Sequence, residues 1–96
     1  MAQAVIWQPE AKEDFREIVD YLLDNWPPDV AEKFTGQVDK AQELIQLHPG
    51  IGMKVGRPRS VRKVAIPPHH FLYYTLIDEE IWILNLLDHR QNPERI

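Results

Sequence analysis

Two stretches of apolar residues at helical spacing, separated by Pro27-Pro28, most constrain what this chain can fold into. In the first stretch one helical face is apolar and the other acidic, and the apolar residues are Ala11, Phe15, Ile18, Val19, Leu22 and Trp26. The second stretch repeats this pattern with Val30, Phe34, Val38, Ala41, Leu44, Ile45 and Leu47. Asp29 and Glu32 have the form of a capping box at its start. Residues 10–26 and 29–47 are therefore predicted to form an antiparallel helical hairpin.

The remaining apolar segments read as strands, which would cover the apolar faces of the hairpin. Residues 4–7 form a short apolar run before Pro9, and residues 60–66, 71–77 and 80–87 are rich in Val, Ile, Leu, Tyr and Trp. Residues 49–60 hold three glycines and two prolines and are predicted to form a loop. The expected fold is one α+β domain over residues 1–96. It has an N-terminal strand, the helical hairpin and a three-stranded antiparallel meander, in one sheet with the helices on one face.

The aromatic residues suggest which parts are buried. Trp7, Trp26 and Trp82 are expected to fill the core between helices and sheet. Tyr73 and Tyr74 are adjacent in a predicted strand and should point to opposite faces, so we expect one to be a core residue and the other to be exposed.

Size and composition exclude several classes of function. A chain of 96 residues forms one thin core with no room for an enclosed cofactor cavity, so we expect no cofactor and an open working face. The absence of cysteine excludes a disulfide framework, a thiolate metal site and a Cys nucleophile, and fits a reducing cytoplasm. We expect no metal site, and neither a signal peptide nor a membrane span is evident.

Charge is strongly segregated along the chain, although the net charge is only −4. Residues 1–48 carry ten acidic and four basic side chains, whereas residues 49–64 carry five basic and no acidic ones. These five are Lys54, Arg57, Arg59, Arg62 and Lys63. Arg62 and Lys63 should point to opposite faces of their strand, so only one of them can join a common site with the loop arginines. Arginines in a Gly/Pro loop suit carboxylate or phosphate partners.

Several local strings, in this order and spacing, resemble one family over nearly the whole chain. They are Pro9-Glu10-Ala11, Asp14-Phe15-Arg16-Glu17-Ile18, Tyr21, His48-Pro49-Gly50-Ile51-Gly52, Gly56-Arg57-Pro58, Arg62-Lys63, Phe71-Leu72-Tyr73-Tyr74, the segment 81–87 and His89-Arg90-Gln91-Asn92-Pro93. Together they resemble the RelE/ParE superfamily of toxins from bacterial toxin–antitoxin modules, and more closely its ParE-like branch.

The resemblance implies a small toxin that is held inactive by a cognate antitoxin encoded beside it. RelE-like members cut mRNA in the ribosomal A site, whereas ParE-like members are associated with inhibition of DNA gyrase. The implied partners are therefore the antitoxin and either gyrase or the ribosome, in a toxin homodimer or a toxin–antitoxin hetero-oligomer. A non-toxic interaction module of the same fold is a further alternative.

The two branches need different residues. RNA cleavage needs a general base, a general acid and cations over the phosphate, for which this chain offers Arg57, Arg62, Tyr74 and His89. A binding toxin would contact its target or antitoxin through Arg57, Arg59, Arg62, Lys63, His89 and Arg90.

Three departures from the nuclease pattern favour the binding toxin. Phe71 stands where nuclease members often carry Arg, the usual terminal Tyr is absent, and the first helix is acidic. At His69-His70 we expect a solvated turn rather than a ligand pair.

Overall fold

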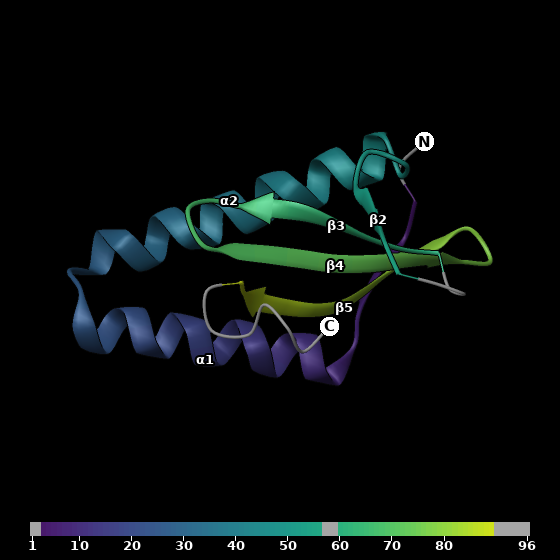
Figure 1. The fold of residues 1–96 in the computed structure, drawn as a ribbon. Coiled ribbons are helices and arrows are strands. Elements are labelled where there is room, and N and C mark those ends of the chain that lie inside the picture. Colours follow the sequence, from purple (N-terminus) through teal and green to yellow (C-terminus); the bar gives the residue numbers. More distant parts are fainter. Residues whose placement is uncertain (1–2, 57–59, 90–96) are drawn as a thin grey trace.

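The computed structural model describes residues 3–56 and 60–89, which form two helices and one five-stranded sheet (Figure 1). The elements in chain order are β1 (Val5–Trp7), α1 (Pro9–Asn25), α2 (Pro28–Leu47), β2 (Met53–Val55), β3 (Val61–Ile66), β4 (His70–Ile77) and β5 (Glu80–Asp88). This confirms the predicted α+β fold class. No helix in the described ranges is long and apolar enough to cross a membrane.

Prolines set the boundaries of both helices. Pro9 and Pro28 lie at the first positions of α1 and α2. A backbone N–H at this position has no acceptor within the helix, so proline, which lacks the N–H, breaks no helical hydrogen bond there. Pro27, directly after Trp26, disfavours helical backbone at the end of α1. The predicted capping box is wrong, because α2 begins at Pro28 and its N-cap, Pro27, forms no side-chain hydrogen bond.

The strand order in the sheet is β1-β5-β4-β3-β2. β3, β4 and β5 form the predicted antiparallel meander, and β1 joins the far side of β5 in parallel. β2 lies in the segment predicted to be a loop, so that prediction is wrong for Met53–Val55. This short strand pairs with β3 through Met53↔Lys63 and Val55↔Val61 and forms one edge of the sheet.

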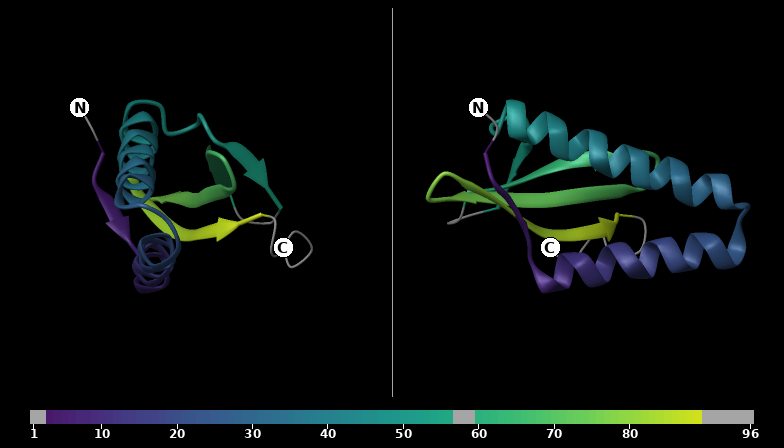
Figure 2. Two further views of the ribbon diagram at one scale, coloured as in Figure 1. Left: turned by 90° about the vertical axis from the view of Figure 1, so that its left-hand side faces the viewer. Right: turned by 180° about the vertical axis from the view of Figure 1, so that it is seen from behind.

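Both helices pack on the same side of β3, β4 and β5 (Figure 2). The core lies between the two helices and the sheet. The helices contribute Ala11, Phe34, Val38, Ala41 and Ile45 to it. The sheet contributes Ile66, Leu72, Tyr74, Ile81, Ile83 and Leu86. We call the face of the sheet turned away from the helices the outer face.

A β-bulge in β5 keeps this core continuous. Tyr73 pairs with Asn85 but Tyr74 pairs with Ile83, so Leu84 is the extra residue. The bulge reverses the alternation of side chains, which explains why Ile83 and Leu86 both face the helices. Asp14 of α1 accepts a hydrogen bond from the backbone N–H of Leu86 at 3.0 Å and holds the helix against this irregularity.

Of the three tryptophans, Trp7 packs against the core as predicted, and Trp26 and Trp82 do not. Trp7 packs against the core, contacts Phe15 edge to face and donates a hydrogen bond from Nε1 to Oε1 of Gln42 at 2.9 Å. Trp82 is half-buried, and Trp26 is 55% exposed. Trp26 is therefore not a core residue, because it lies after the last turn of α1, where the chain turns into α2.

Candidate functional site

The basic segment of the sequence is only partly described by the structure. Arg57 and Arg59, and also Arg90 near the C-terminus, lie outside the described residues. Lys54, Arg62 and Lys63 are described, and they lie on the paired strands β2 and β3.

Arg62 binds the backbone of the loop that follows α2. Its Nη1 donates hydrogen bonds to the carbonyl oxygen of Gly52 at 2.7 Å and to that of Gly50 at 3.1 Å. In the sheet Arg62 is paired with Tyr74, a core residue, so it shares the helix side of the sheet. The guanidinium group thus links β3 to the loop.

Lys63 lies on the outer face, as its position next to Arg62 predicts. Its Nζ lies 4.2 Å from the centre of the Phe71 ring, in a cation–π arrangement. The ring centroid of His89 lies 5.5 Å from that of Phe71 and 6.4 Å from that of His69. The backbone N–H of His89 also donates to the carbonyl of His69 at 3.0 Å. We call Lys63, His69, Phe71 and His89 the outer-face cluster.

Tyr74, a candidate for proton exchange with RNA, is fully buried. Its hydroxyl donates a hydrogen bond to the carbonyl of Pro49 at 2.7 Å and accepts one from the N–H of Gly52 at 3.0 Å. The hydroxyl is therefore committed to the same loop that Arg62 binds. This geometry supports a structural role and offers no route for a substrate to reach the phenol.

Tyr73 is also buried, with 6% of its surface exposed, so the prediction that one of the two tyrosines would be exposed is wrong. It belongs to the outer face because it alternates with Leu72 and Tyr74 and pairs with Lys63. Burial raises the pKa of its phenol. Tyr73 therefore stays protonated at neutral pH.

The two histidines after Pro67-Pro68 divide between the faces. His69 joins the outer-face cluster, whereas His70 begins β4 and meets the ring of Phe34 on the helix side at 5.2 Å. His70 is half-buried, so the prediction of a solvated turn is wrong for it. No group of three potential metal ligands was found within residues 3–56 and 60–89.

The outer-face cluster combines one ammonium, two imidazoles and an aromatic surface. Such a set can receive an acidic side chain or a phosphate group against Phe71. Sequence reasoning had placed Lys63 and His89 among the binding residues but had not assigned Phe71 or His69 to the site. Phe71 comes beside Lys63 through the register of β3 with β4, and His69 beside His89 through the register of β4 with β5. The sequence predicts the meander but not its register.

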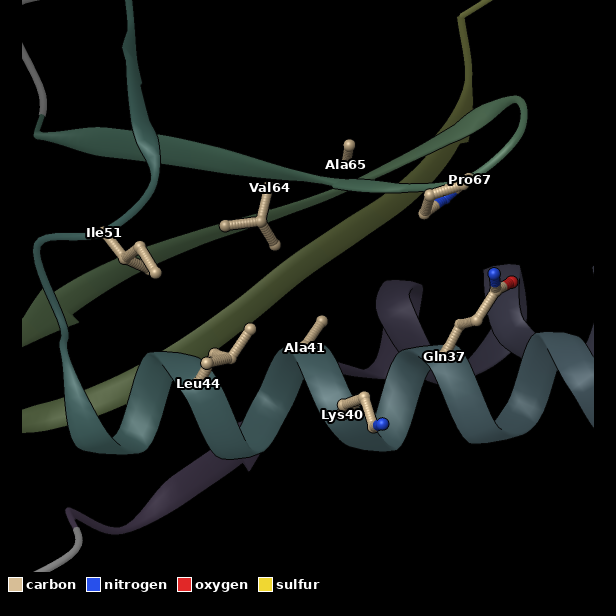
Figure 3. Close-up of a pocket in the computed structure, with 8 residues that line it drawn as sticks. All are labelled: Gln37, Lys40, Ala41, Leu44, Ile51, Val64, Ala65 and Pro67. Atoms are coloured by element: carbon tan, nitrogen blue, oxygen red, sulfur yellow. The ribbon is translucent and has the colours of Figure 1, made fainter.

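A second feature that sequence reasoning missed is a groove between α2 and β3, with a volume of about 280 Å³ (Figure 3). Its lining residues are Gln37, Lys40, Ala41, Leu44, Ile51, Val64, Ala65 and Pro67. We call it the α2–β3 groove. The apolar periodicity of α2 indicated only the helical part of the groove lining, because Ile51 of the loop after α2 also contributes to it.

Solved structures with this architecture include chains from bacterial toxin–antitoxin systems. A chain of the chromosomal ParDE system from P. aeruginosa matches with a TM-score of 0.75 and 18% identity, over 91% of this chain and 96% of that chain. A YoeB dimer from Staphylococcus aureus matches with a TM-score of 0.65 and 22% identity, over 88% and 94% of the two chains. A variant of the E. coli toxin RelE in the free state matches with a TM-score of 0.65 and 16% identity, over 97% of this chain and 90% of that chain.

At these identities the structural matches establish the fold and no more. A sequence comparison with curated proteins finds no significant match. The family model for the ParE toxin of the type II toxin–antitoxin system parDE, however, matches residues 5–93, which is nearly the whole chain. The chain therefore belongs to the ParE toxin family of type II toxin–antitoxin systems, within the RelE/ParE superfamily.

Proposed function

We propose that this toxin is neutralised by a cognate antitoxin and inhibits its target, such as DNA gyrase, by binding it rather than by cleaving RNA. One observation carries the proposal. Tyr74 and Arg62 are two of the candidate catalytic residues for RNA cleavage. Both side chains are hydrogen-bonded to the backbone of the loop at residues 49–52. The phenol of Tyr74 is fully buried, and Nη1 of the half-buried Arg62 is committed to two backbone carbonyls.

The outer-face cluster supports binding. Lys63 and His89 contact Phe71, which places an apolar surface beside a positive charge. A combination of aromatic and cationic side chains is typical of residues that anchor protein–protein interfaces. In this proposal the cluster contacts the target or antitoxin, together with the predicted contacts Arg57, Arg59 and Arg90.

Two observations support the proposed antitoxin partner: the family of the chain and the complexes in which structurally similar chains are found. Type II toxins are paired with antitoxins by definition of the system, and similar chains are found in complexes such as YoeB-YefM from S. aureus. A short open reading frame beside the gene, encoding a DNA-binding fold with a disordered tail, would support this proposal.

A RelE-like, ribosome-dependent mRNA endonuclease is the second candidate. The observation that favours it is the presence of Lys63 and His89 on one face, since a cation and an imidazole are two of the groups that such cleavage needs. In that case His89 would exchange the proton and Lys63 would stabilise the phosphate, and Arg57 remains a predicted contact.

Induction of the protein in cells, followed by parallel measurement of DNA supercoiling and mRNA integrity, separates the two candidates. We expect relaxed or broken DNA with intact mRNA, and weaker growth inhibition in Arg57→Ala. Codon-phased mRNA cuts that vanish in His89→Ala would overturn the proposal. His48→Ala is the matched control, because His48 is an exposed histidine at the end of α2. No growth inhibition at all would instead support a non-toxic interaction module.

A further inference from the structure

Two histidines that are 20 residues apart in the sequence lie opposite each other on the outer face. His69 precedes β4 and His89 follows β5, and the backbone N–H of His89 donates to the carbonyl oxygen of His69 at 3.0 Å. Their ring centroids are 6.4 Å apart, with an angle of 52° between the ring planes. We call these two residues the histidine pair. Residues directly opposite on neighbouring strands have Cβ atoms only about 4.5 to 5.5 Å apart, so the backbone holds both rings close together.

The surroundings of the histidine pair orient its rings and leave them accessible to solvent. His89 is exposed and His69 is half-buried. Phe71 meets the ring of His89 edge to face, which favours one orientation of that ring. His70 does not take part, because its ring packs against Phe34 on the helix side. The pair therefore arises from the register of β4 with β5, and the adjacent histidines at positions 69 and 70 do not form it.

The separation of the two rings is close to what one shared metal ion requires. A bond between Zn²⁺ and an imidazole nitrogen is about 2.0 to 2.1 Å long, which puts the ring centroid about 3.2 Å from the ion. Two rings bound to a tetrahedral ion then have centroids about 5 Å apart. Side-chain rotation that brings the rings of the histidine pair about 1 Å closer would reach this geometry. Either ring nitrogen of a histidine can be the ligand, so each ring offers two chances to meet the ion.

The type of ligand selects the ion. Imidazole suits zinc, copper and nickel, whereas magnesium and calcium prefer oxygen ligands. Asp88 is adjacent to His89 in the sequence, but it pairs with His70 in the sheet and therefore belongs to the helix side. Within residues 3–56 and 60–89 no group of three histidine, aspartate or glutamate side chains could hold a metal ion, so water would complete the coordination. The positive charge of Lys63 near Phe71 repels a cation and keeps the affinity modest.

We propose that the histidine pair is a two-ligand site for a divalent transition-metal ion, Zn²⁺ in the first place, with water in the remaining coordination positions. A bound ion would add two positive charges to the outer-face cluster, and a carboxylate of a partner could replace its water. That consequence for binding of the target or antitoxin rests on the proposed function. The metal site itself rests on the geometry of the two rings.

The test is a titration of the full-length protein with ZnCl₂. The protein carries no histidine tag, because a tag would itself bind the ion. At about pH 7.5 most imidazole is neutral and can act as a ligand. Isothermal titration calorimetry gives the affinity and the stoichiometry, and NMR spectra of the imidazole groups identify the ligands. We expect one ion per chain and shifts of the ring signals of His69 and His89.

Variants localise the site. His69→Gln and His89→Gln should each weaken Zn²⁺ binding at least about tenfold, because two ligands held together bind one ion far more tightly than one ligand does. His48→Gln is the matched control, because His48 is an exposed histidine at the end of α2, and it should bind as the unchanged protein does. His89 is also exposed, so its variant tests the proposal even if His69→Gln folds poorly.

Three results would overturn the proposal: no saturable binding of Zn²⁺, an affinity that His89→Gln leaves unchanged or that His48→Gln lowers equally, or one ion bound by two chains. The last would identify a site shared between two copies of the chain. Because no result here depends on toxicity, a failed titration leaves the proposed function standing. A protein that does not inhibit growth leaves the metal site standing in turn.

Discussion

The hydroxyl of Tyr74, in the middle of β4, donates a 2.7 Å hydrogen bond to the carbonyl of Pro49, in the loop that follows α2. The same oxygen accepts the N–H of Gly52 at 3.0 Å, and Arg62 binds the carbonyls of Gly50 and Gly52. Four hydrogen bonds from two side chains therefore fix this loop to the sheet. They position the chain to enter β2 at the sheet edge.

Tyr74→Phe should destabilise the protein by about 1 to 3 kcal/mol, because it leaves a backbone N–H and a carbonyl without their partner in a buried place. Equilibrium unfolding in urea measures the change. Tyr21→Phe removes a hydroxyl from a side chain that is 60% exposed, and it should leave the free energy of unfolding nearly unchanged. Equal stabilities of the two variants would show that the Tyr74 bonds contribute nothing.

Gly52→Ala should also be destabilising, by about 1 to 3 kcal/mol, because the added Cβ overpacks the site. A Cβ at this position would lie 2.8 Å from Cε1 and Oη of Tyr74 and 2.9 Å from the carbonyl oxygen of Lys63. Gly50→Ala is the control, since a Cβ there meets nothing within 4 Å. If Gly52→Ala unfolds at the same urea concentration as Gly50→Ala, the close approach is not real.

The loop that Tyr74 and Arg62 hold to the sheet leads into a part of the fold that could not be predicted from the sequence. The helical hairpin and the meander follow from local apolar periodicity, and both were predicted. β2 was not, because Met53, Lys54 and Val55 are too few to show a strand pattern, and they pair with β3 next to the loop that Tyr74 and Arg62 hold to the sheet. The outer-face cluster likewise depends on the register between β3 and β4, in which Lys63 pairs with Tyr73 and Ala65 with Phe71, so that Lys63 and Phe71 are neighbours on the outer face.

Substitutions at Arg62 and Lys63 should separate structure from function. Arg62→Ala removes two hydrogen bonds to the loop and should lower stability by about 1 to 2 kcal/mol, with the partial exposure of Arg62 reducing the effect. Lys63→Ala removes one cation–π contact and should cost less than about 1 kcal/mol. If Lys63→Ala weakens growth inhibition while its unfolding curve stays close to that of the unchanged protein, Lys63 contacts the target. An equally large loss of stability in both variants would contradict this division.

Stability should decline at alkaline pH in a way that depends on Tyr73. Burial raises the pKa of Tyr73 above its ordinary value of 10.0, so the folded state holds the phenol proton more tightly than the unfolded state does. Below pH 10 both states are protonated and Tyr73 has no effect, whereas above it the unfolded state ionises first and stability falls. Tyr73→Phe should therefore flatten the decline above pH 10 in urea unfolding. An unchanged slope would contradict the raised pKa.

The turn between β4 and β5 offers a stabilising substitution. Asp78 and Glu79 have φ angles of 51° and 66°, the left-handed pair required at the centre of a two-residue type I′ hairpin. Glycine reaches this conformation without steric cost, so Glu79→Gly should stabilise the protein by about 0.5 to 1 kcal/mol after the added freedom of the unfolded chain is counted. The contact from Nε2 of Gln3 to the Glu79 carbonyl is kept, because it uses the backbone. Glu80→Gly, one residue later in β5, should instead destabilise, since glycine weakens a strand. Thermal unfolding of the two variants decides the matter, and a lower midpoint for Glu79→Gly would show that the turn gains nothing from glycine.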